Sequence, residues 1–187
     1  MSQSDLIAFF IRQAEAMGAQ VIPVDGAWGI GPKLVEVLRP FGQRVALVES
    51  PMSREAGLET ALAVAGFHIE KDGADFARQA DTGIVEFDYG IAETGTLAMD
   101  ATDLKTRLAT MLPLTCVALL RAERVRSNLT EVIDAYLERG NWPGYFTLVT
   151  GPSRTADIER SLTIGVHGPE RLLIILVENN GGGRHGR

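Results

Sequence analysis

Leu172-Leu-Ile-Ile-Leu-Val177 is a run of six consecutive apolar residues, and it decides the fold class. An unbroken apolar run of this length predicts a strand that is buried on both faces, as strands inside a parallel sheet are. Similar short runs recur at residues 20–24, 44–48, 83–87, 115–120 and 145–149. Segments with helical spacing alternate with these runs. The alternation predicts an α/β fold with a mostly parallel sheet flanked by helices.

The helical segments are delimited by residues that start and stop helices. We expect helices over residues 6–17, 32–38, 53–64, 103–111 and 129–138. Ser53 is the expected N-cap of the third, and glycines follow several of the others. No stretch resembles an interdomain linker, so residues 1–180 are predicted to form a single domain. The glycine-rich residues 181–187 are predicted to be a flexible tail.

The composition restricts the possible functions. The chain has 187 residues, a net charge of -6, one cysteine and three histidines. One cysteine cannot form an internal disulfide, and so few thiols and imidazoles argue against a metal site or an iron-sulfur cluster on this chain. An acidic chain without a Lys/Arg run is not expected to bind nucleic acid. The first residues resemble neither a signal peptide nor a transmembrane segment, which predicts a cytoplasmic protein.

A candidate anion site follows the run at residues 145–149. The sequence there is Thr150-Gly-Pro-Ser-Arg-Thr-Ala-Asp-Ile-Glu159, which we interpret as a turn followed by the start of a helix. Free amide groups at a helix start, next to an arginine, suit a phosphate or a small carboxylate. The predicted ligand-binding residues of this stretch are Gly151, Ser153, Arg154, Thr155 and Asp157.

A second candidate stretch is Tyr89-Gly-Ile-Ala-Glu-Thr-Gly-Thr-Leu97, which follows a predicted strand. Loops at the carboxyl ends of strands are the usual ligand sites of open α/β sheets. Glu93 is a candidate general base or nucleophile, and Thr94, Gly95 and Thr96 are candidate ligand-binding residues. The alternative is that this stretch is a glycine-permitted bend whose polar groups only satisfy loop amides.

Two further features allow two interpretations each. His167, in Gly165-Val-His-Gly-Pro169, is either a catalytic group that titrates near neutral pH or a turn residue bonded to the backbone. Arg121, Arg124 and Arg126 surround Glu123 and are either a solvated, self-compensating segment or a phosphate-binding cluster.

Taken together, these strings resemble a known family. Residues 91–97, 151–159 and 165–169 are similar, in sequence and in order, to the signatures of the LUD domain, and within that family to lactate-utilisation protein C. The resemblance covers roughly the last hundred residues and implies the fold of glucosamine-phosphate deaminases, ribose-phosphate isomerases and CoA transferases.

The resemblance also implies a function. We expect a subunit or accessory protein for the oxidation of L-lactate to pyruvate, which has a small-anion pocket and works beside iron-sulfur lactate-utilisation proteins. The clusters would then lie on those partners, with no cofactor on this chain. One alternative is a stand-alone CoA-transferase-like or sugar-phosphate isomerase-like enzyme that uses Glu93, and another is a non-catalytic adaptor.

Overall fold

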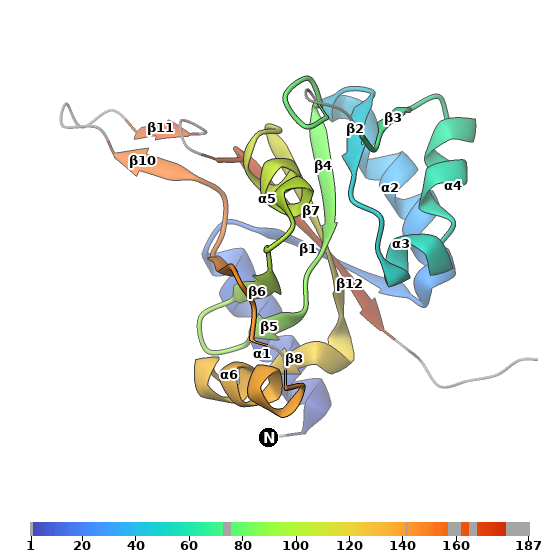
Figure 1. The fold of residues 1–187 in the computed structure, drawn as a ribbon. Helices are drawn as coiled ribbons and strands as arrows, with labels where there is room; N and C mark the ends of the chain where they lie inside the picture. The colour runs from blue at the N-terminus through green and yellow to red at the C-terminus, as the bar shows by residue number, and fades with distance from the viewer. Residues whose placement is uncertain (1, 73–75, 141, 157–161, 165–167, 179–187) are drawn as a thin grey trace, which may run out of the picture.

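The centre of the molecule is a six-stranded parallel sheet (Figure 1). The computed structural model describes residues 2–72, 76–140, 142–156, 162–164 and 168–178, with 154–156 and 162–164 described by their backbone. The strand order is β1 (Gln20–Asp25), β12 (Arg171–Glu178), β7 (Thr115–Arg121), β4 (Thr82–Glu86), β2 (Arg44–Leu47) and β3 (His68–Glu70). Every adjacent pair in it is parallel. The predicted α/β class with a mostly parallel sheet is confirmed.

Strand β12 lies inside this sheet and is buried on both faces. Leu172, Ile174 and Leu176 belong to the apolar cluster on one face. The alternate residues of the strand, Leu173, Ile175 and Val177, belong to the cluster on the other face. All six are at most 3% exposed, and burial of each such side chain is worth about 1.5–3 kcal/mol. The apolar run therefore stabilises both layers of the domain.

Three helices cover one face of the sheet: α2 (Ile30–Leu38), α3 (Pro51–Glu55) and α4 (Leu58–Val64). The expectation of one helix over residues 53–64 was wrong. Gly57, between α3 and α4, has φ 57° and ψ 35°, and this left-handed conformation ends one helix before the next begins. The N-cap of α3 is Ser50, whose side chain accepts a hydrogen bond from the Ser53 amide.

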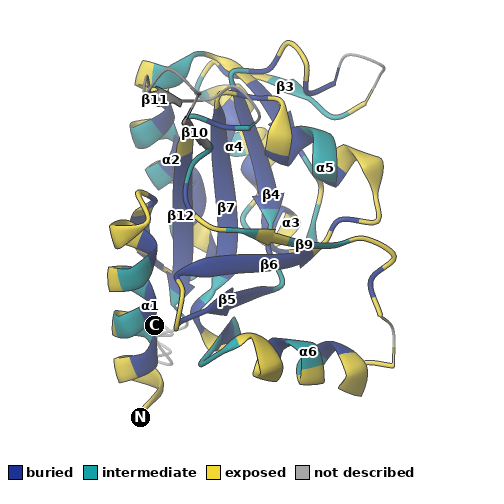
Figure 2. Ribbon diagram, turned by 90° about the vertical axis from the view of Figure 1, so that its left-hand side faces the viewer, coloured by how far each residue is buried: buried dark blue, intermediate teal, exposed yellow. Residues whose placement is uncertain are grey.

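The other face is covered by α1 (Gln3–Ala16), α5 (Leu104–Met111) and a second sheet (Figure 2). The second sheet has the order β8 (Val125–Arg126), β5 (Tyr89–Ile91), β6 (Thr96–Asp100) and β9 (Phe146–Val149). Helix α6 (Leu129–Glu138) packs against its outer side through Val132 and Tyr136. The run at residues 145–149 was expected in the parallel sheet but supplies β9, which is antiparallel to β6. No helix in the described ranges is both long and apolar enough to cross a bilayer.

Candidate functional site

The Glu93 stretch forms the turn between β5 and β6. Gly95 has φ +64°, and a Cβ atom at this position would overlap the backbone of Gln13 and Ala14 in α1. Glu93 is exposed, and its amide donates a hydrogen bond to the carbonyl oxygen of Ser127. For Gly95 the structure therefore favours the interpretation as a glycine-permitted bend, because only glycine allows the turn to approach the helix so closely.

Three threonine hydroxyls join this turn to the stretch that follows β9. The Thr94 and Thr96 hydroxyl oxygens are 2.7 Å apart, and those of Thr96 and Thr150 are 2.8 Å apart. Thr96 is buried, whereas Thr94 and Thr150 are exposed. Gly151 follows directly and packs against Met17 at the end of α1. The structure thus brings the two predicted loops together at this hydroxyl chain.

The helix expected after Ser153 was wrong for residues 154–156. They form strand β10 (Arg154–Ala156), which pairs with β11 (Leu162–Ile164) in an antiparallel ladder. The Ser153 amide donates to the carbonyl oxygen of Pro169 at 2.8 Å, so it is not free for an anion. Arg154 and Thr155 are therefore strand residues, with their side chains outside the description, and Asp157 and His167 lie outside the described residues.

A cleft lies at the carboxyl edge of the six-stranded sheet, between the ends of β2 and β4. After β2 the next strand of this sheet is β3, on one side, whereas after β4 the chain passes through β5, β6 and α5, and the next strand of this sheet is β7, on the other side. This divergence is a topological switch point, where open α/β sheets usually bind their ligands. The cleft has a volume of about 550 Å³, and its lining includes Ser50, Glu86, Arg121, Arg124 and Arg139.

Most charged groups of the cleft already have partners. The Arg121 guanidinium donates to Glu55 of α3 at 2.6 Å, which raises the pKa of Arg121. The Glu86 carboxylate accepts a hydrogen bond of 2.9 Å from the Met52 amide. These bonds hold α3 at the edge of the cleft, and neither group needs a ligand to balance its charge.

Asp88 ties the cleft to helix α6. Its carboxylate accepts hydrogen bonds of 2.8 Å from the Tyr136 hydroxyl and from the Asp100 amide, and Arg139 lies 3.4 Å away. Burial, followed by the charge of Asp88, raises the pKa of Tyr136 well above its ordinary value. Tyr136 is therefore a donor to Asp88 at all physiological pH values.

Arg124 differs from Arg121 and Arg139, the other arginines of the cleft, which both pair with an acid. It belongs to the short helix η3 (Ala122–Arg124), is half-buried, and lies 5.7 Å from the ring centre of Tyr89. Arg126 and Arg139 lie over the same ring, at 5.4 and 4.9 Å. Within the ranges that the structure describes, Arg124 has no acidic partner. A half-buried guanidinium without a carboxylate partner is suited to bind an anionic ligand.

The interpretation of Arg121, Arg124 and Arg126 as a segment compensated by Glu123 was wrong for the partners of Arg121 and Arg126. Arg126 donates to the backbone carbonyl of Glu123 and not to its carboxylate, while Arg121 and Arg139 pair with Glu55 and Asp88. Those acids lie more than 50 positions away in the sequence. The local charge pattern therefore indicated Arg121 and Arg124 of the cleft but gave no signal for Arg139 or for the two acids.

Comparison with known proteins places the chain in a family. The model of the LUD domain matches residues 7–177. A protein of Geobacillus kaustophilus named lactate utilization protein C is 29% identical, over 94% of this chain and 80% of its own length. A protein of the same name from Macrococcus caseolyticus is 36% identical over 55% of this chain and 46% of its own length.

A solved structure has the same fold. The crystal structure of a DUF162-family protein from Deinococcus radiodurans aligns with a TM-score of 0.68 at 18% identity, covering 95% of this chain and 99% of that one. The chain belongs to the LUD-domain family, as the resemblance of its signature strings predicted.

Proposed function

We propose that this chain takes part in the oxidation of L-lactate to pyruvate and binds the substrate carboxylate in the cleft between the ends of β2 and β4. Two findings support the proposal: the similarity to proteins named lactate utilization protein C, and the half-buried Arg124 without a described acidic partner. The second observation carries the site assignment. A guanidinium binds a carboxylate through two parallel hydrogen bonds, which orients the acid as well as holding it.

The proposed chemistry requires an electron acceptor. Conversion of lactate to pyruvate releases two electrons and two protons, and the single, buried cysteine does not provide the four thiolates of an iron-sulfur cluster. The proposal therefore places the acceptors on iron-sulfur partner proteins. A cleft of about 550 Å³ is in the size range of sites for drug-sized ligands, so it leaves room for a second reactant beside a three-carbon acid.

Calorimetry on the purified chain tests the site. L-lactate, pyruvate, phosphate and CoA are titrated into the natural protein, into Arg124→Gln and into Arg12→Gln. Arg12 lies exposed on α1 over Phe9 and outside the cleft, so its replacement makes the same charge change elsewhere. We expect lactate or pyruvate to bind, with affinity reduced about tenfold in Arg124→Gln and unchanged in Arg12→Gln.

The other results have defined meanings. An equal loss of affinity in Arg124→Gln and Arg12→Gln would mean that only the net charge of the protein matters. Arg124 would then not be part of the binding site. Binding of CoA that a further variant, Glu93→Gln, loses would favour the transferase-like alternative, in which this exposed carboxylate is the nucleophile. No binding of any of the four compounds would favour an adaptor that acts only within a complex.

A further inference from the structure

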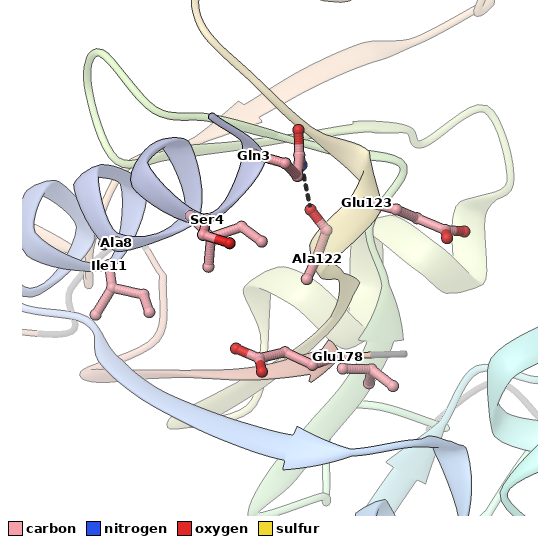
Figure 3. A pocket seen from close by; sticks show the side chains of 9 residues that line it. Gln3, Ser4, Ala8, Ile11, Ala122, Glu123 and Glu178 are labelled. Carbon is pink, nitrogen blue, oxygen red and sulfur yellow. Dashed lines mark hydrogen bonds between the residues drawn. The ribbon is translucent and has the colours of Figure 1, made fainter. Parts of the chain in front are cut away.

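A separate groove lies beside helix α1, and its lining includes Ala122 and Glu123 of η3. It has a volume of about 440 Å³ and runs between α1 and the end of β12 (Figure 3). Its lining combines the apolar side chains of Ile7, Ala8 and Ile11 of α1 with the polar side chains of Gln3, Ser4 and Glu178. The groove and the cleft have no lining residue in common.

The groove contains a carboxylate that is available for a cation. Glu178 is half-buried and extends toward α1, whereas the Glu123 side chain points away from that helix (Figure 3). Among the described residues, the Glu178 side chain has no hydrogen bond or ion pair. The lining includes no lysine, arginine or histidine. The Gln3 amide group is already engaged, because it donates to the Ala122 carbonyl oxygen at 3.1 Å.

A second carboxylate makes this edge more negative. Asp25 on β1 is the register neighbour of Glu178, and neighbours in a parallel ladder project from the same face of the sheet. A half-buried carboxylate in the groove, with a second acid next to it on β1, lies near the apolar side chains of α1, and this combination favours a ligand with a cationic head and an apolar stem. An arginine side chain has this form, since its methylene chain packs on apolar surface while the guanidinium binds a carboxylate.

We propose that this groove binds an arginine side chain of a partner protein. The guanidinium pairs with Glu178, and the stem lies along the face of α1 that carries Ile7 and Ile11. The inference goes beyond the proposed function, because it assigns a docking surface to a part of the chain that is not used for the substrate. Residues of the same short helix, η3, line both hollows: Ala122 and Glu123 line the groove, and Arg124 lines the cleft.

The test uses N-acetyl-L-arginine amide as the probe, with N-acetyl-L-citrulline amide as its uncharged match. Both are titrated into the ¹⁵N-labelled full chain while amide shifts are followed. We expect saturable shifts at Ser4, Ala8 and Ile11 with the arginine probe only. Glu178→Gln should weaken binding about fivefold, whereas Glu138→Gln, an exposed acid on α6, should leave it unchanged.

Three results would overturn the proposal: equal shifts with both probes, no shifts along α1, or equal losses in both variants. The double variant Arg184→Gln/Arg187→Gln tests whether an arginine from the chain's own last residues occupies the groove instead. If the probe binds only in that variant, the groove belongs to this chain's own arginines and not to a partner. Lactate binding measured on the same samples is independent, so failure here leaves the proposed function intact.

Discussion

Replacement of Gly95 by alanine should destabilise the protein far more than an ordinary glycine replacement. Gly95 lies in the turn between β5 and β6 with φ +64°, and a Cβ atom there would overlap the backbone of Gln13 and Ala14. Backbone atoms of a helix cannot rotate away as a side chain can. The hairpin and α1 must therefore separate, and both belong to the same apolar cluster.

The magnitude follows from two contributions. A left-handed conformation costs an alanine about 1 kcal/mol, and forcing an extra group into a packed contact costs about 2 kcal/mol more. We expect the free energy of unfolding to fall by about 3 kcal/mol in Gly95→Ala. Gly140 provides a matched control, because it has φ +67° and no described atom within 4 Å of a Cβ position. Gly140→Ala should cost only about 1 kcal/mol.

Urea unfolding followed by circular dichroism measures both values. With a slope of about 3 kcal/mol per M, the midpoint should fall by about 1 M in Gly95→Ala and by about 0.3 M in Gly140→Ala. Equal shifts in the two variants would refute the argument, because they would mean that contact with α1 adds nothing to backbone strain.

Two further predictions concern buried polar groups. Burial raises the pKa of the Cys116 thiol to about 12, so iodoacetamide at pH 8 should label the protein only after unfolding; rapid labelling of the native chain would show that the thiol is accessible. Tyr136→Phe removes the hydroxyl that donates to Asp88, and should lower the free energy of unfolding by about 2 kcal/mol in urea titrations. Because the folded-state pKa of Tyr136 is raised, its contribution is complete below about pH 10 and is lost at higher pH. Spectrophotometric titration should therefore show a late tyrosine ionisation that is missing in Tyr136→Phe, and identical titration curves for the two proteins would contradict the bond to Asp88.

The core of the fold was predictable because burial on both faces leaves a direct trace in the sequence. The apolar run at residues 172–177 was predicted as an inner strand and is one, and α5 begins directly after its N-cap Asp103, at the start expected for the helix over residues 103–111. The assignment of the run at residues 145–149 to the parallel sheet failed, because an apolar run does not specify its neighbour. The break at Gly57 was missed because the apolar spacing continues across it.

The candidate site was predicted less well, for a different reason. The hydroxyl chain of Thr94, Thr96 and Thr150 joins loops that the sequence had singled out separately. The cleft, however, depends on contacts between distant residues, such as Arg121 with Glu55 and Tyr136 with Asp88. Such contacts decide whether the charge of an arginine is neutralised. They cannot be read from a single sequence, because the partners lie far apart along the chain.

The position at which the substrate carboxylate binds can be located by NMR. Amide shifts of the ¹⁵N-labelled chain are followed during titration with L-lactate and with pyruvate. We expect saturable shifts around the cleft, at Ser50, Glu86, Arg121 and Arg124, which disappear in Arg124→Gln. Shifts confined to Thr94, Thr96, Thr150 and Gly151 would contradict this prediction and return the anion site to the loops beside α1.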